Sequence, residues 1–384
     1  MSKVIFEACG IDVHKEMLSI CLTNRELTRT RFFEIPNQGD AIRELIGILK
    51  AHRVQQVAYE STSIYWLLLH DLLEPQFDCT LVNSRQVKAI PGRKTDAKDA
   101  EWLATLIAKQ LLKKSYVPPI QIRQLRELCR LVRTLKAEQN RFLNRQIKLL
   151  DQWNCNFLTA FSKPETRTCQ YLLLGLAQQH SWEELVAQAP TQRIQNELHH
   201  KQSQLKSKLM TDLPAAARLE LQVIRRIITT HQEEIDRLET EIEVQASTLN
   251  WEPQIELIAS IPGIGKQSAI ALYSEFGEIS KFPTPSHLVA WTGLAPSVYQ
   301  SAGKQYTGHI TKQGNRHIRY ILYNCVVPAL RDKSTDLSRF YQRLRKLKPS
   351  KVVKVALMTK ILRIIHHLLT SGEFFLARPL KLKS

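Results

Sequence analysis

The sequence predicts a mixed α/β domain, then long paired helices, then a mostly helical C-terminal domain. Three observations predict this order. Short apolar runs alternate with amphipathic runs in residues 1–115, and apolar residues at heptad spacing follow in residues 116–250. Residues 251–384 combine apolar helical runs with Gly-containing turns. Because 384 residues exceed what one core normally covers, we expect these three stretches to be separate domains.

The first stretch has the element order βββαβαβα, which is typical of a mixed sheet covered by helices. Apolar runs predict strands at Val4–Cys9, Met17–Leu22, Arg31–Ile35, Gln55–Tyr59 and Cys79–Val82. Amphipathic runs predict helices at Ala41–Lys50, Ile64–Leu73, Ser84–Ile90 and Asp96–Leu112.

Four acidic residues fall at the ends of these elements. Asp12 ends the first strand, Glu60 ends the fourth, and the last helix opens with Asp96 and Asp99 on one face. Carboxylates that converge on one rim of a sheet repel each other unless a cation lies between them, and oxygen ligands suit Mg²⁺ or Mn²⁺. This arrangement is similar to that of RNase H-like nucleases, where two metals act on a scissile phosphate. For the helix start alone, the alternative is an acidic first turn that complements the helix dipole.

Two heptad seams predict long helices in the middle stretch. The first seam runs from Leu125 to Trp153 with polar interruptions at Gln139 and Gln146, and the second runs from Ile224 to Leu249. The two helices could pair antiparallel within one chain, or they could pair between chains. His231 lies on the second seam, and we expect it to be a structural polar residue rather than a ligand.

Gly-containing segments of the last stretch have the composition of phosphate-binding turns. Apolar runs flank Ile261–Lys266, which predicts a helix-hairpin-helix whose glycines allow a close approach to phosphate; the alternative is an ordinary tight turn. Trp291–Arg319 is rich in Gly, hydroxyl groups and cations. The nucleic-acid contacts expected here and beside the acidic helix are Lys94, Lys98, Gly263, Gly265, Lys266, Lys304, Lys312, Asn315, Arg316 and Arg319.

The composition favours a polyanionic partner. The formal net charge is +18, and residues 331–384 hold 14 Lys and Arg against 3 Asp and Glu. Nucleic acid is the first candidate and an anionic membrane surface the second. No apolar run reaches the roughly 18 residues of a membrane span, and Met1–Glu7 lacks a signal-peptide core, so we expect a soluble cytoplasmic protein. The seven scattered cysteines form no CxxC pair and are expected to be reduced thiols.

Seven short motifs in this order resemble those of the IS110-type transposases, the DEDD recombinases that include the Piv-type invertases. The resemblance covers nearly the whole chain. The N-terminal motifs are Gly10–Lys15, Tyr59–Thr62 and Lys94–Ala100. The C-terminal motifs are Ile261–Gly265, Gly293–Pro296, Ser301–Lys304 and Ile310–Asn315.

The resemblance implies a RuvC-like N-terminal domain whose DEDD residues are Asp12, Glu60, Asp96 and Asp99. It implies Mg²⁺ or Mn²⁺ as cofactor, a coiled coil that supports a dimer or tetramer, and a C-terminal serine that attacks DNA and forms a phosphoserine link. That serine is Ser301. Many members have Gly where this chain has Ala302, which keeps nearby Ser297 as an alternative nucleophile. Some members also use a noncoding RNA that pairs with donor and target DNA.

Three functions remain in competition at this level. The first is a DNA transposase with a serine nucleophile. The second is a site-specific invertase or a Holliday-junction endonuclease of the same fold. The third belongs to another class, a non-catalytic nucleic-acid scaffold, and the four intact acidic positions argue against it.

Overall fold

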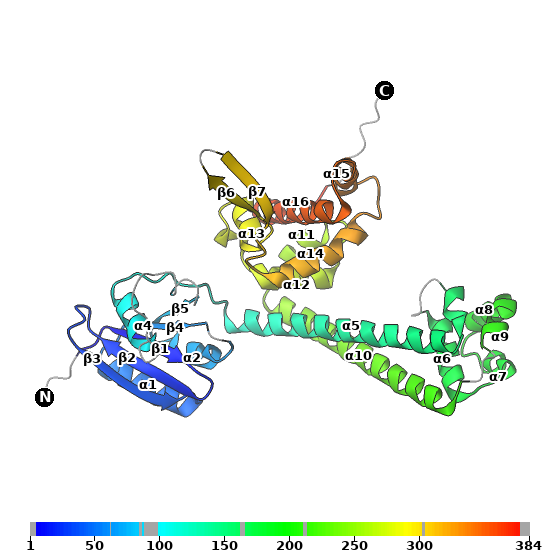
Figure 1. The fold of residues 1–384 in the computed structure, drawn as a ribbon, viewed down its shortest axis with the longest axis horizontal. Coiled ribbons are helices and arrows are strands. Elements are labelled where there is room, and N and C mark those ends of the chain that lie inside the picture. Colours follow the sequence, from blue (N-terminus) through cyan, green and yellow to red (C-terminus); the bar gives the residue numbers. More distant parts are fainter. Residues whose placement is uncertain are drawn as a thin grey trace, which may run out of the picture. The chain divides into compact units, whose positions relative to one another are not determined.

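The computed structural model describes residues 5–61, 63–83, 87, 99–161, 166–209, 213–301 and 304–376. The chain divides into two compact units, Met1–Ile120 and Gln121–Ser384. The first unit is built on a five-stranded sheet, and the second is mostly helical (Figure 1).

The sheet of the first unit is mixed, as the sequence predicts. Its strands are β1 (Ala8–Val13), β2 (Met17–Thr23), β3 (Thr30–Pro36), β4 (Gln56–Glu60) and β5 (Asp78–Val82). They lie in the order β3-β2-β1-β4-β5. β1 pairs parallel with β4, and β4 with β5, whereas β2 is antiparallel to both β1 and β3.

Helices cover both faces of this sheet. On one face, α1 (Gly39–Ala51) and α2 (Trp66–Leu73) pack on Ile11 and Tyr59 in one buried cluster. The other face is covered by α4 (Asp99–Ala108), whose apolar residues pack on Ala8 and Ala58. Successive strand residues point to opposite faces, so each strand contributes to both layers.

The first strand lies further along the chain than Val4–Cys9, where the sequence predicts it. Gly10 does not end β1 but lies in its middle. A Cβ on Gly10 would stand 2.1 Å from the carbonyl oxygen of Ala100 and 2.3 Å from the amide nitrogen of Ala104. Gly10 is therefore a close-packing position for α4, not a breaker. The helix expected at Ser84–Ile90 falls outside the described residues except for Val87.

Two long helices form the frame of the second unit. α5 (Ile120–Gln152) and α10 (Ala215–Thr248) run antiparallel, because Lys136 pairs with Glu239 whereas Arg145, further along α5, pairs with the earlier Glu220. Ile235 is 1% exposed inside the core of its own chain. The seams thus pair within one chain, which is one of the two arrangements that the sequence leaves open. Figure 1 shows both helices side by side.

Each end of this helix pair packs into its own apolar core. One core is completed by short helices between the long ones: η2 (Asn156–Ala160), α6 (Arg167–Gln178), α7 (Trp182–Ala187), α8 (Gln192–His200) and α9 (Gln202–Leu209). The other core is completed by the C-terminal elements: α11 (Glu252–Ala259), α12 (Lys266–Phe276), η3 (Ile279–Lys281), α13 (Pro285–Trp291), α14 (Arg316–Ala329), α15 (Asp336–Arg345) and α16 (Ser350–Ser371).

The cysteines, the apolar helices and the turn between α11 and α12 each bear on an expectation from the sequence. All seven cysteines are free thiols, and six of them are buried. In the described ranges, no helix combines the length and the apolar character needed to cross a bilayer. The turn between α11 and α12 lies where the helix-hairpin-helix is expected, and whether it binds phosphate stays a prediction.

Candidate catalytic sites

The register of the sheet places two predicted carboxylates on one face. Ile11 and Tyr59 are paired between the parallel strands β1 and β4, and both are buried under α1 and α2. The next residues, Asp12 and Glu60, therefore point to the opposite face, which α4 covers. Both are half-buried and stand at the carboxyl ends of their strands.

The direction of α4 brings Asp99 to the same end of the sheet. The last residue of the helix, Ala108, lines a small cavity with Ala8 and Gln56, which start β1 and β4. The helix thus runs opposite to these strands, and its first residue, Asp99, lies toward their carboxyl ends. Three of the four predicted carboxylates share this end of the sheet, and Asp96 lies outside the described residues.

The donor set of this site consists of carboxylate oxygens, which suit Mg²⁺ or Mn²⁺. In the part of the chain that the structure describes, no three His, Cys, Asp or Glu side chains are gathered closely enough to hold a metal ion. Asp12 instead has its Oδ2 3.0 Å from Nε2 of His14, with 19% of its own side chain exposed. Opposite Asp12 on β2, Ser19 donates to Glu34 over 2.9 Å. The described carboxylates have the donor chemistry of a divalent-cation site and lie toward one end of the sheet, but they do not form a complete site.

The predicted nucleophile lies at one end of a two-stranded hairpin. β6 (Pro296–Ser301) and β7 (Lys304–Ile310) pair antiparallel, and Ser301 stands opposite Lys304 at the turn. The side chains of these two residues lie outside what the structure describes. Ser297 lies at the other end of β6, where its Oγ donates to the carbonyl oxygen of His309 over 2.9 Å. The hydroxyl of Ser297 is therefore engaged in holding the two strands together.

The base of this hairpin is held by close backbone contacts. Gly314 has φ +139°, and a Cβ there would stand 2.2 Å from the carbonyl oxygen of Trp291. Only glycine tolerates both this conformation and this approach. Arg319 donates through Nη1 to the carbonyl oxygens of Thr292 (2.7 Å) and Gly314 (3.2 Å). Arg319, expected to contact nucleic acid, thus joins the segments that enter and leave the hairpin.

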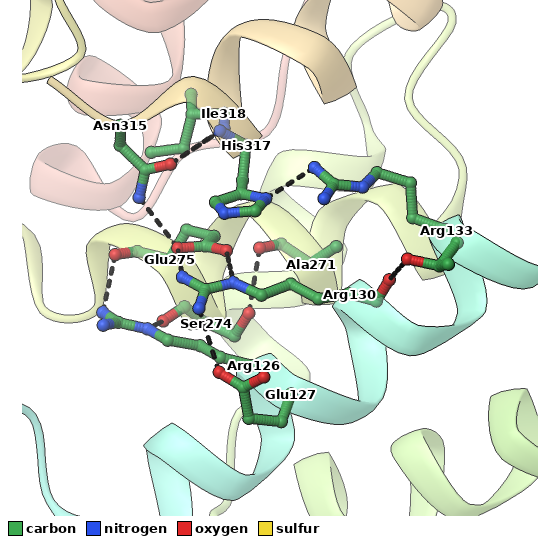
Figure 2. Close-up of polar contacts among 11 residues, drawn as sticks. Arg126, Glu127, Arg130, Arg133, Ala271, Ser274, Glu275, Asn315, His317 and Ile318 are labelled. Atoms are coloured by element: carbon green, nitrogen blue, oxygen red, sulfur yellow. Dashed lines mark hydrogen bonds and ion pairs between the residues drawn. The ribbon is translucent and has the colours of Figure 1, made fainter. Parts of the chain in front are cut away.

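A buried carboxylate connects this region to α5 (Figure 2). Glu275 at the end of α12 has 2% of its side chain exposed and receives Nε and Nη2 of Arg130 at 2.9 and 3.0 Å. Asn315 donates to Oε2 over 2.8 Å, and its own Oδ1 caps α14 by accepting from the amide of His317. Burial raises the pKa of Glu275, but the hydrogen bonds from Arg130 and Asn315 outweigh it and hold this pKa below its ordinary value.

Sequence reasoning predicts only Asn315 of this network, as a nucleic-acid contact, whereas its amide bonds Glu275. The sequence nevertheless contains two signals for the network. Arg126, Arg130 and Arg133 are spaced by four and three residues beside the first seam, which places them on one face of α5. Glu275 is the one acidic residue of α12, a largely apolar helix. Arg126 also bonds α12, donating to the carbonyl oxygens of Ser274 and Glu275 at 2.5 and 2.6 Å.

The remaining predicted nucleic-acid contacts have varied surroundings. A Cβ on Gly263 would stand 2.4 Å from the amide nitrogen of Ala329, so this glycine has a packing reason to lack a side chain. Nothing lies within 4 Å of the corresponding position at Gly265, and Lys266 pairs with Glu243 on α10. Lys312 and Arg316 are exposed. Lys94, Lys98 and the side chain of Lys304 lie outside the described residues.

Comparisons with known proteins agree with this architecture. A family model of DEDD transposases of the IS110 type matches residues 9–155, and a model described as "Transposase IS116/IS110/IS902 family" matches residues 255–342. Together they span more than half of the chain. A probable family 20 transposase of Pseudomonas aeruginosa is 25% identical over 96% of this chain and 95% of its own length.

Two further relatives match over shorter stretches. The transposase for insertion sequence element IS1328 of Yersinia enterocolitica is 27% identical over 44% of this chain and 52% of its own. A pilin gene-inverting protein of Moraxella bovis is 29% identical over 33% of this chain and 41% of its own. The mixed sheet of the first unit, followed by a mostly helical remainder, fits a DEDD nuclease-like domain. The chain belongs to the IS110 family of transposases.

Proposed function

We propose that this transposase cuts and rejoins the DNA strands of an insertion sequence with two sites, a metal-binding DEDD site and a serine nucleophile. The DEDD site consists of Asp12, Glu60, Asp96 and Asp99, and the nucleophile is Ser301. The observation that carries the proposal is the placement of Asp12 and Glu60 on the face under α4, at the end of the sheet where Asp99 begins that helix.

The carboxylates would hold Mg²⁺ or Mn²⁺ beside the scissile phosphate. A bound divalent cation supplies charge neutralisation at the phosphate during strand cleavage. In our proposal, Oγ of Ser301 attacks phosphorus, the bond to a DNA oxygen breaks, and that oxygen leaves as a DNA hydroxyl. A DNA hydroxyl then attacks the phosphorus of the phosphoserine and the bond between phosphorus and Oγ breaks. Oγ takes up a proton, so Ser301 regains its hydroxyl and the strand is rejoined. The engaged hydroxyl of Ser297 supports Ser301 as the nucleophile.

The test is to incubate the full chain with its flanking DNA, Mg²⁺ and co-expressed noncoding RNA, and to look for protein-linked DNA in denaturing gels. We expect a covalent product from wild type and from Ser297→Ala, and none from Ser301→Ala. If Ser301→Ala cleaves like wild type, water is the nucleophile and only the nuclease part of the proposal survives. Loss of the covalent product in Ser297→Ala alone would move the nucleophile four residues earlier.

We further propose that the basic C-terminal region holds RNA as well as DNA, and that the active form is a dimer or tetramer. The net charge of +18 supports a phosphate-dominated interface. Such an interface loses affinity steeply as salt rises, because bound Lys and Arg release counterions. Omitting the noncoding RNA from the reaction above tests whether that RNA directs the enzyme to its DNA. An enzyme guided by RNA then forms no covalent product at the element ends.

A second candidate function is site-specific inversion of DNA, favoured by the similarity to the pilin gene-inverting proteins over 133 residues. The two functions differ in the DNA around the gene. Short flanks that bound one mobile unit, with a structured noncoding stretch, indicate transposition. A pair of inverted sites around another gene indicates inversion.

A further inference from the structure

A cavity of about 220 Å³ opens beside the Glu275 network, between α5, α10, α12 and α14. One wall is apolar and includes Val132, Ile242, Ala271 and Ile321. The polar lining includes three cations and two carboxylates beside His317 and Tyr320; the cations are Arg130, Arg133 and Lys136, and the carboxylates are Glu239 and Glu275. The cavity therefore suits a ligand that has both an apolar part and an anionic part.

The cations around this cavity are not equally compensated. Lys136 pairs with Glu239, and Arg130 pairs with Glu275. Among the described residues, Arg133 has no carboxylate partner. One positive charge on the lining is thus left for an anion from outside.

The surroundings of Arg133 keep that charge available and hold the guanidinium in place. Its Nη1 donates to Nδ1 of His317 over 2.5 Å, and Cζ lies 5.3 Å from the ring centre of Tyr320 (Figure 2 shows the contact with His317). Burial and the nearby charge of Arg130 lower the pKa of His317 to about 4, so the imidazole is neutral at pH 7. A neutral acceptor and an aromatic ring orient the guanidinium without neutralising it.

We propose that this cavity binds one unstacked nucleotide of a nucleic-acid strand, with Arg133 on its phosphate and the apolar wall and Tyr320 against its base. A guanidinium fork matches phosphate oxygens, and aromatic or apolar surfaces accept bases of single strands without sequence preference. The site would hold a strand that has left its duplex, either displaced DNA or RNA. The inference rests on the nucleic-acid substrate of the proposed function, but not on the identity of the nucleophile.

The test uses short single-stranded DNA and RNA oligonucleotides in which 5-iodouracil replaces thymine or uracil, bound to the full chain without Mg²⁺. Fluorescence anisotropy gives the affinity, and irradiation followed by peptide mapping gives the position of the base. We expect a crosslink at Tyr320 and a roughly tenfold weaker affinity for Arg133→Gln. Ala271→Leu adds bulk to the cavity and should remove the crosslink while changing affinity less. The DNA and RNA arms show which strand the cavity takes.

The matched control is Arg141→Gln, an exposed arginine of the same helix that does not line the cavity. It removes the same charge and should keep the crosslink. The inference is overturned if oligonucleotides bind but no crosslink maps to Tyr320, or if Arg133→Gln and Arg141→Gln weaken binding equally. The Ser301 chemistry can still succeed in that case, because covalent product formation is measured separately. Absence of any oligonucleotide binding would also overturn the inference.

Discussion

Gly10 of β1 and Ala100 of α4 lie so close that a Cβ on Gly10 would stand 2.1 Å from the carbonyl oxygen of Ala100. The obstacle is backbone, so it cannot rotate away as a side chain would. This contact sets the distance between α4 and the strand that carries Asp12. Because Asp99 directly precedes Ala100, the same contact also sets where Asp99 lies relative to Asp12.

We predict that Gly10→Ala lowers the free energy of unfolding by about 1–3 kcal/mol, because α4 must move away from the sheet. DNA cleavage should fall more strongly than DNA binding, since Asp99 moves with the helix. The control is Gly47→Ala in α1, where nothing lies within 4 Å of the added carbon. It should stabilise by about 0.5–1 kcal/mol. Urea unfolding of both variants checks the pair, and equal stabilities would show that the close approach is not rigid.

We predict that Asp12→Asn, Glu60→Gln or Asp99→Asn each abolishes Mg²⁺-dependent cleavage and leaves the fold intact. Each change removes one negative charge from an end of the sheet that carries several carboxylates, so stability without metal should hold or rise. The control is Asp40→Asn in α1, because its side chain is 96% exposed and it is not one of the four predicted carboxylates. Cleavage assays with and without chelator check the outcome. Wild-type rates in two of the three variants would remove these carboxylates from the mechanism.

The sequence predicts much of this fold because its signals are local. Alternating apolar runs predict the strands, and heptad spacing predicts α5 and α10, since both depend on the periodicity of one element. The predicted position of β1 is wrong because Gly10 does not end the strand but packs against α4, some ninety residues later in the chain. The Glu275 network could not be predicted for the same reason. Its members come from α5, α12 and the residue that caps α14, and only the folded core brings Arg130 and Asn315 to one carboxylate.

We predict that Glu275→Ala destabilises the second unit by about 3–5 kcal/mol, because it leaves Arg130 without its buried partner. It also frees Asn315, so the base of the β6–β7 hairpin should loosen and covalent product formation should fall. The control is Glu127→Ala, which removes the other, 72% exposed, partner of Arg130 and should cost at most about 1 kcal/mol. Denaturant unfolding of both variants measures the difference. Equal costs would show that burial of Glu275 adds nothing to this pair.

We predict that Gln146→Leu stabilises the protein by about 1–3 kcal/mol. Gln146 of α5 is fully buried, and no described group hydrogen-bonds its amide oxygen or nitrogen. A buried amide without partners costs about this much relative to an apolar side chain of similar size. The control is Gln139→Leu, which removes real hydrogen bonds to Gln232 and to the carbonyl oxygen of Ile228. Thermal unfolding should rank Gln146→Leu above wild type and Gln139→Leu at or below it. The opposite ranking would contradict the prediction.

Stability of the second unit should also fall as the pH drops from 7 toward 5, and His317 is the group responsible. Its pKa is lowered to about 4 in the folded chain, against about 6.5 when unfolded. Between these values the unfolded state binds more protons than the folded state, so stability rises with pH and is fully present only above about pH 6.5. The pKa of Glu275 is lowered as well, but its contribution is lost only at more acidic pH, below its ordinary range.

The measurement is the urea midpoint of wild type and His317→Gln at pH 7 and pH 5. The wild type should lose more stability than the variant, by less than the roughly 1.4 kcal/mol per pKa unit of a fully buried group, because His317 is partly exposed and solvent screens its charge. Parallel losses in both proteins would place the pH dependence in other histidines.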